Sequence, residues 1–343
     1  MKTILSITYR VVKTVAYFNF HKSYFYISIF CIGNQSSYLF SSVKQSFVQL
    51  NNLVIILGSM FTYQELVSQN LSKVFYFGGL ITNMQGAVVN IYSFMLNNYQ
   101  NCKTTDVQYS GFIIGHAQNI NNSITIINIC LQQSLIGLGK FQNLGLIGYN
   151  DGNLSLQEGH ITISTELSQQ FDVLGMVGYQ TQLSLFSEVR SSVVRLLTSP
   201  WKITNVGTLF GCNFAKQQRL NDIIVNRSKI IADIFSGGLI GELDETIYVQ
   251  NITVQFSNIT NTGDYAAAFF SYAGSSTKIT IENSVINSVR VSSFRSSGLI
   301  TGDNLHQPPF NIKNSKSIGA NYINNALQAN CASFTNVWSP NQC

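Results

Sequence analysis

Acidic residues are the starting point for a search for catalysis, because glycoside hydrolysis needs two carboxyl groups held at a fixed separation. The 343-residue chain contains only 15 acidic residues. The closest groupings are Asp222 with Asp233, and Glu242 with Asp244 and Glu245. The second grouping directly follows the stretch Gly-Gly-Leu-Ile-Gly, where a solvated acidic loop accounts for it. We therefore nominate no catalytic residue.

Histidine and serine offer no stronger candidate. The chain has four histidines, which are His21, His116, His160 and His306. His116 follows a repeated turn but has no acid or nucleophile near it in the sequence, so we expect a surface or turn histidine rather than a catalytic one. No Gly-x-Ser-x-Gly elbow, phosphate-binding loop or dinucleotide fingerprint occurs. The sequence predicts neither catalysis nor a cofactor.

Cysteine spacing gives no metal site either. The six cysteines are Cys31, Cys102, Cys130, Cys212, Cys331 and Cys343. None forms a Cys-x-x-Cys pair or a zinc-ligand set with histidine. Cys331 and Cys343 could close a short loop, which suits an oxidising compartment. Cys102 and Cys130 lie about one repeat apart, but free thiols packed as small hydrophobic side chains remain an equal alternative.

Composition limits the partners that the chain can bind. Hydrophobic residues make up 45% of the sequence, whereas charged residues make up only 10%, against about 25% in an average protein. The net charge is +5, and the densest basic stretches, residues 290–295 and 313–316, hold two cations each. Nucleic-acid binding needs a clustered basic face, so we expect no nucleic acid as partner. No apolar run reaches the ~18 residues of a membrane span.

Glycosylation motifs bear on the compartment. Asn-x-Ser/Thr sequons begin at Asn34, Asn70, Asn121, Asn153, Asn226, Asn251 and Asn258. In a secreted protein they would be glycan acceptors on exposed turns, although a chain rich in Asn, Ser and Thr also produces them by chance. They favour an extracellular or cell-surface location.

A repeated turn motif indicates the strands that would position any functional site. A small-residue turn followed by two aliphatic residues returns about every thirty residues. The copies are GGLIT (78–82), SGFIIG (110–115), LGLIGY (144–149), LGMVGY (174–179), GTLFGC (207–212), GGLIGE (237–242), AAAFFS (266–271) and SGLITG (297–302). The alignment is anchored on Gly79, Gly111, Gly145, Gly175, Thr208, Gly238, Ala268 and Gly298, which lie 30–34 residues apart.

Between these turns the apolar residues alternate with polar ones. Examples are SITIIN, HITIST, NITVQFSN and KITIEN. Alternation with a period of two is typical of a strand with one buried face. We expect the aliphatic position of each turn to form an internal ladder of Leu80, Phe112, Leu146, Met176, Leu209, Leu239, Phe269 and Leu299. Both aliphatic residues of a turn can face inward only if the chain bends there, so we expect a bend at the glycine.

A thirty-residue unit of short strands cannot bury its apolar face alone, but stacked copies can. Propeller blades and leucine-rich repeats have other periods, and helical stripes are missing. The sequence therefore predicts an all-β fold, a right-handed parallel β-helix (β-solenoid) with about eight recognisable coils of roughly 30 residues. Residues 58–322 would form the solenoid. Residues 1–57 are interpreted as an N-terminal cap or a degenerate export signal, and residues 323–343 as a Cys-bearing tail.

At the repeated turn the sequence resembles a known family. The segment GLIGYNDGNLSL (145–156) is similar to a GLUG-type repeat, which consists of Gly-Leu-aliphatic-Gly, an Asn/Gly-rich turn and a strand. Thr82 and Ser271 depart from this pattern by replacing the second glycine. Such repeats occur in large surface and secreted proteins of bacteria and protists. The resemblance implies a β-helix and an adhesin-like role, and it carries no catalytic residues.

Function is therefore expected to be non-catalytic. The leading hypothesis is a structural or adhesive surface module that presents an Asn/Ser/Thr-rich lateral face to a glycan or protein partner. The alternatives are a carbohydrate-active β-helix enzyme, which would need acids and an arginine grouped on one face, and a partial copy of a larger repeat protein. Tyr149 and Tyr179 occupy the same motif position and are expected to stack, either as a binding ladder or as a shield over a coil corner.

Overall fold

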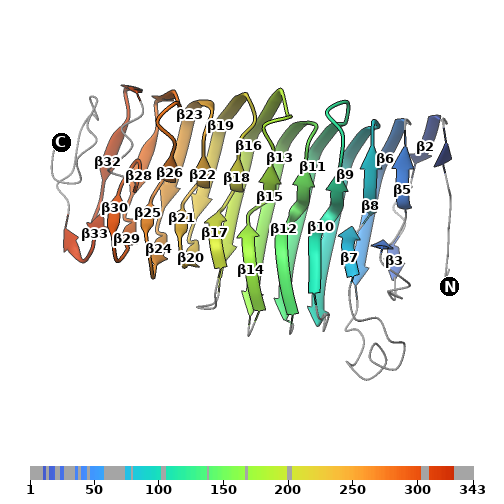
Figure 1. Cartoon of the computed structure of the whole chain (residues 1–343), viewed down its shortest axis with the longest axis horizontal. Coiled ribbons are helices and arrows are strands. Elements are labelled where there is room, and N and C mark those ends of the chain that lie inside the picture. The colour runs from blue at the N-terminus through green and yellow to red at the C-terminus, as the bar shows by residue number, and fades with distance from the viewer. Residues whose placement is uncertain are drawn as a thin grey trace.

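Alternating apolar residues build strands, and the strands stack into a solenoid. The structure is a computed structural model, and it describes strands between residues 11 and 57, then residues 74–78, 80–101, 106–136, 139–166, 169–198, 203–302 and 309–327. Within these ranges all regular structure is β-strand, with no helix. Successive coils lie side by side along the long axis of the molecule (Figure 1). The predicted all-β parallel solenoid is confirmed.

The first strands are β1 (Val11–Val12), β2 (Val15–Asn19), β3 (Tyr24–Tyr26), β4 (Gln35–Ser37), β5 (Phe40–Lys44), β6 (Phe47–Leu57), β7 (Val74–Gly78), β8 (Ile81–Gln85) and β9 (Val88–Asn101). The central strands are β10 (Asp106–Ala117), β11 (Ser123–Ile136), β12 (Gly139–Asn150), β13 (Asn153–Glu166), β14 (Gln169–Leu174), β15 (Val177–Gln180), β16 (Phe186–Leu197), β17 (Ile203–Gly207), β18 (Phe210–Asn213), β19 (Gln217–Asn226) and β20 (Lys229–Ala232).

The last strands are β21 (Phe235–Gly237), β22 (Ile240–Leu243), β23 (Thr246–Gln255), β24 (Asn258–Asn261), β25 (Tyr265–Ala267), β26 (Phe270–Ala273), β27 (Ile279–Glu282), β28 (Val285–Asn287), β29 (Arg290–Ser292), β30 (Ser296–Gly298), β31 (Phe310–Lys313), β32 (Lys316–Ile318), β33 (Tyr322–Ile323) and β34 (Ala326–Leu327).

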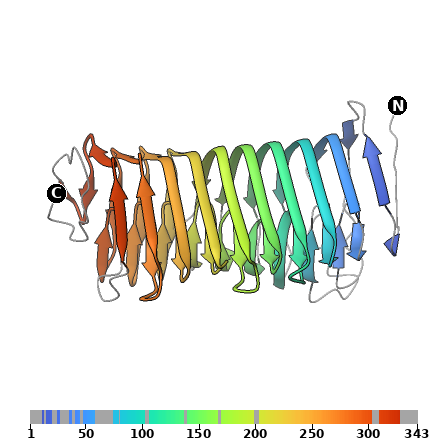
Figure 2. The same cartoon turned by 90° about the horizontal axis from the view of Figure 1, so that it is seen from above.

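These strands form two ladders, which Figure 2 shows from above. Ladder A contains the repeated turns and runs β1-β5-β8-β10-β12-β14-β17-β21-β25-β30. Ladder B contains the alternating segments, with β9, β11, β13, β16, β19 and β23 paired in that order. The pairing is parallel except between β33 and β34, which are antiparallel. Strands within residues 1–57 continue both ladders, because β5 pairs with β8 and β6 with β9. The proposed domain boundaries stay predictions.

The expected bend lies at the repeated turn. In one coil, Thr208 and Leu209 separate β17 from β18, and the same break separates β14 from β15. Both aliphatic residues of the turn consequently face the core, because Leu209 and Phe210 are each fully buried. Leu239 continues this ladder, accepting a hydrogen bond from Leu209 N at 2.9 Å.

Two members of the predicted ladder are wrong by one residue. Ile114 pairs with Ile147 while Gly111 pairs with Gly145, so one extra residue lies in between and the fully buried Ile113, rather than Phe112, takes the ladder position. Near the C-terminal end of the stack, Gly298 pairs with Ala267 rather than with Ala268, so this coil is one residue longer than the coil before it, in which Ala267 pairs with Gly237. Phe270 N there donates to Ile300 O at 2.9 Å, and Ile300 is buried whereas Leu299 is only partly buried.

Small residues at the bend are required by close approach of the backbones. A Cβ added to Gly238 would overlap Ala268 O. Where Thr or Ser stands in place of a glycine of the motif, its hydroxyl hydrogen-bonds to the backbone. Thr208 Oγ1 donates to Gly238 O in the next coil. Ser271 Oγ donates to Tyr265 O at 2.6 Å and accepts from Ser236 N at 3.0 Å. Thr82 lies in β8, and its side chain is outside the described residues.

Ladder B turns at two corners, each marked by left-handed residues. The first corner has φ between 49° and 56° at Glu158, Ser191, Asp222, Asn251, Asn283 and Asn314. The second corner has φ between 50° and 71° at Arg227, Phe256, Ser288 and Gly319. Asn, Asp and Gly tolerate this conformation best, and they occupy five of these ten positions.

Serine hydroxyls satisfy the backbone at these corners. Ser284 Oγ accepts from Ile252 N in the preceding coil at 3.3 Å and donates to Glu282 O in its own coil at 3.0 Å. Ser284 N in turn donates to Ser315 Oγ at 3.0 Å. Buried donors that the bent ladder leaves without a carbonyl partner are thereby paired between coils.

Candidate functional site

The acids predicted to be closest together do not form a catalytic pair. Asp222 lies at the first corner of ladder B and accepts from Asn251 Nδ2 at 2.9 Å. Asp233 lies in the turn after β20 and accepts from Thr262 Oγ1 at 2.8 Å. Each carboxylate therefore has its own polar partner on a different part of the coil, and the two do not share a site.

The second acidic grouping separates in the same way. Glu242 lies in β22, on the bend side of the coil, whereas Asp244 is exposed in the following turn and accepts a 3.5 Å hydrogen bond from Ser276. Glu245 is half-buried in that turn. The predicted solvated loop is correct for Asp244. It is wrong for Glu242, because β22 begins at the bend and carries this side chain against the neighbouring coil.

Glu242 belongs to a three-residue cluster that spans the bend. Asn205 Nδ2 donates to Glu242 Oε2 at 2.7 Å and to Cys212 Sγ at 3.2 Å. The Cys212 thiol donates to the same carboxylate oxygen at 3.5 Å. Burial raises the pKa of Glu242 and is also the largest cause raising the pKa of Cys212, which the nearby Glu242 charge raises further. The thiol therefore stays protonated and is a poor nucleophile.

The position after the second small residue of each motif forms one column along ladder A. The column contains His116, Tyr149, Tyr179, Cys212, Glu242 and Tyr272, which the strand register aligns. This repeated position was recognised in the sequence for the two tyrosines only. The same spacing could have placed Cys212 beside Glu242, but the contact with Asn205 depends on the bend and has no linear signal.

The predicted tyrosine stack is confirmed. The rings of Tyr149 and Tyr179 lie 5.5 Å apart and within 5° of parallel. His116 contacts Tyr149 edge-on at 5.0 Å, and Phe214 contacts Tyr179 in the same manner at 5.4 Å. The stacked pair is therefore flanked by further rings along the axis of the solenoid, so a partner would meet ring edges rather than ring faces.

His116 corrects the expectation of a surface or turn histidine. It lies within β10 and is 5% exposed, because the residue after the motif turn continues the strand. Burial lowers its pKa to about 4, so the ring is neutral near pH 7. His160 is exposed on ladder B, whereas His21 and His306 lie outside the described residues.

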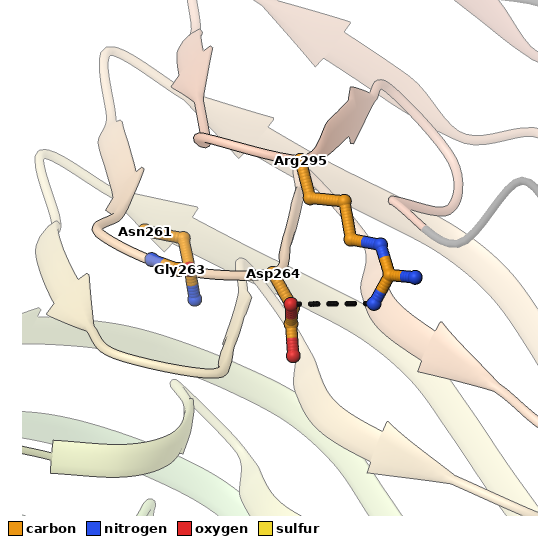
Figure 3. Close-up of polar contacts among 4 residues, drawn as sticks. All are labelled: Asn261, Gly263, Asp264 and Arg295. Atoms are coloured by element: carbon orange, nitrogen blue, oxygen red, sulfur yellow. Dashed lines mark hydrogen bonds and ion pairs between the residues drawn. The ribbon is translucent and has the colours of Figure 1, made fainter.

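Near the C-terminal coils an acid and an arginine meet across adjacent turns (Figure 3). Arg295 NH1 lies 3.5 Å from Asp264 Oδ1, and its guanidinium carbon lies 5.7 Å from the centre of the Tyr265 ring. The turn beneath is fixed by Asn261 Oδ1, which accepts from Gly263 N at 2.7 Å. This exposed ion pair supplies one carboxylate, whereas hydrolysis of a glycosidic bond needs two.

The outer face of ladder B between its corners carries amides in register. Asn226 pairs with Gln255, and Gln255 pairs with Asn287, in three successive coils. All three side chains are half-buried. We call this set the amide column. Side-chain amides thus repeat at the strand spacing of about 4.8 Å; Asn226 Oδ1 itself is buried, and Asn287 Oδ1 accepts from Ser288 Oγ at 2.9 Å.

The structure describes two of the six cysteines and five of the seven sequon asparagines. Cys130 and Cys212 are free thiols, Cys130 exposed and Cys212 buried. The other four cysteines, and sequon residues Asn34 and Asn70, lie outside the described residues. Among the remaining sequons, the acceptors Asn121, Asn251 and Asn258 are exposed, and Asn153 and Asn226 are half-buried.

The described residues contain no group of three or more His, Cys, Asp or Glu that could hold a metal ion. In the same part of the chain, no helix is long and apolar enough to cross a membrane. Comparison of the chain with family models, with curated proteins and with solved structures found no match.

Proposed function

We propose that the protein is a non-catalytic repeat module that binds a glycan or protein partner along its lateral face, at the cell surface or in the extracellular space. The observation that carries this proposal is the amide column of Asn226, Gln255 and Asn287, where uncharged hydrogen-bonding groups repeat once per coil. A polymer or an extended protein surface can engage such a column at several coils in succession. The GLUG-type resemblance of residues 145–156 supports the same adhesin-like role.

The arrangement of the acids supports a binding module over a carbohydrate-active enzyme. Asp222, Asp233 and Glu242 each hydrogen-bond to a separate amide or hydroxyl partner on different parts of the coil. Retaining and inverting glycosidases alike need two carboxyl groups about 5–10 Å apart across the substrate. A dispersed set of acids is what a binding module would carry.

Binding is tested by probing arrays of neutral glycans and of extracellular proteins with the purified chain. A Gln255→Ala/Asn287→Ala variant is compared with Thr246→Ala/Thr280→Ala, which also removes two polar groups from the outer face of ladder B. We expect the first variant to weaken binding of the array ligand about ten-fold and the control by less than about two-fold, in line with the loss of one to two hydrogen bonds. Equal effects of the two variants would refute the role of the amide column.

Location is tested separately, by adding protease to intact producing cells and analysing the products on reducing and non-reducing gels. Cleavage of the chain on intact cells, with a change in mobility on reduction, is the expected result. Full protection from protease would contradict the extracellular assignment.

A further inference from the structure

Folding brings together four cations that are scattered in the sequence. Arg195, Arg227, Lys229 and Arg290 are all exposed around the second corner of ladder B. Lys229 pairs with Asn258, and Asn258 pairs with Arg290, so these two cations lie in one column two coils apart. We call the four residues the corner cluster.

Two contacts hold members of the corner cluster in place. Arg195 Nε donates to the backbone oxygen of Arg227 at 3.1 Å, so two guanidinium-bearing residues meet between adjacent coils. The guanidinium carbon of Arg290 lies 4.7 Å from the centre of the Tyr322 ring. Both arginines are therefore positioned by contacts that involve no acid.

No acid neutralises this cluster among the described residues, where none of its four cations takes part in an ion pair. The first corner of ladder B carries two acids, Glu158 and Asp222, and Asp222 is engaged by Asn251. Like charges placed close together repel each other, so a cluster without acids is most stable when an anion is bound.

The cluster also adjoins the amide column. Val194 pairs with Val225, which places the next residues, Arg195 and Asn226, side by side on adjacent coils. Cations and neutral hydrogen-bonding groups thus form one continuous strip along the outer face. Arginine forks suit sulfate and carboxylate oxygens, and the amides suit hydroxyl groups.

We infer that this strip binds an acidic glycan, whose sulfate or carboxylate groups contact the corner cluster while its hydroxyl groups contact the amide column. The inference rests on the proposed binding function and names the ligand class at the same face. A nucleic acid fits less well, because binders of single strands stack bases on open aromatic faces and the Tyr322 ring lies against Arg290.

The probe for the test is a fluorescent heparin oligosaccharide, titrated against the full chain at about 0.15 M salt. Arg227→Asn/Lys229→Gln removes two cluster charges, and asparagine suits the φ of 51° at position 227. Lys216→Gln/Lys278→Gln is the matched control, because both lysines are exposed in turns outside the cluster and the net charge changes equally. Circular dichroism verifies that each variant folds.

We expect the cluster variant to raise the heparin Kd about ten-fold or more and the control by less than about two-fold, because screening confines the effect to nearby charges. Equal increases in the two variants, or no binding of heparin by the wild type, would overturn the inference. Tighter binding of a single-stranded DNA of equal length, lost in the same variant, would also overturn it in favour of a nucleic acid. Neutral ligands found on the arrays would in either case leave the proposed function standing.

Discussion

Replacing Leu239 by alanine tests the internal ladder at the centre of the stack. Leu239 is fully buried and lies between Leu209 and Phe269, to which its backbone hydrogen-bonds at 2.9 Å on each side. The change removes three carbons, which at about 0.8 kcal/mol each gives about 2.4 kcal/mol of lost transfer free energy. The cavity left between the two neighbouring coils raises the expected loss of unfolding free energy to about 3–4 kcal/mol.

The assay is equilibrium unfolding in urea, followed by circular dichroism and by tyrosine fluorescence. The control is Ile224→Ala, which removes an apolar side chain that is 39% exposed on the outside of ladder B, and which should cost about 1 kcal/mol or less. Coils of a solenoid contribute through nearest-neighbour terms, so a defect in the middle of the stack weakens two interfaces. Similar losses of stability for Leu239→Ala and Ile224→Ala would refute the assignment of the ladder to the core.

Three further predictions concern polar groups. Ser271→Ala should lower the unfolding free energy by about 1–3 kcal/mol, because it leaves Ser236 N without its acceptor; hydrogen exchange at Ser236 measures the opening. Since the folded-state pKa of Glu242 is raised, stability should fall as pH rises from about 4.5 through that raised pKa, and Glu242→Gln should remove this decline in urea midpoints. The Cys212 thiol, buried and with a raised pKa, should react with iodoacetamide at least about 100-fold more slowly than the exposed Cys130, as followed by mass spectrometry; comparable rates would contradict its burial.

Much of the fold could be predicted because the repeat links local pattern to long-range contact. Leu146, Met176 and Leu209 were assigned to the core from spacing alone, and all three are fully buried. The errors at Phe112 and Leu299 have one cause. Alignment on small residues cannot locate an extra residue. At Phe112 the extra residue lies between the anchor Gly111 and the aliphatic pair, whereas at Leu299 it lies before Gly298, which pairs with Ala267 rather than with Ala268.

The polar clusters could be predicted only in part. Tyr149 and Tyr179 share a motif position with the same residue type, so their stacking was visible in the sequence. The contact of Asn205 with Glu242 requires the chain to double back at the bend, which period-two patterning does not describe. Basic residues such as Arg195 and Lys229 looked scattered because linear density ignores which coils lie side by side.

The serines at the first corner of ladder B, such as Ser284 and Ser315, link the coils in one direction along the stack, because each hydroxyl accepts a hydrogen bond from the preceding coil. Ser284 Oγ accepts from Ile252 N in the preceding coil, and Ser284 N donates to Ser315 Oγ in the following coil. Replacing Ser315 by alanine would therefore leave the backbone N–H of Ser284, one coil away, without its acceptor. A duplicated or deleted block keeps every such donor matched only if it spans whole periods of about thirty residues from one corner serine to the next. The stack therefore accommodates the addition or removal of complete coils, whereas shorter length changes fall at the bend, as between Gly111 and Ile114, or in the turn between the ladders, as between Gln180 and Ser187.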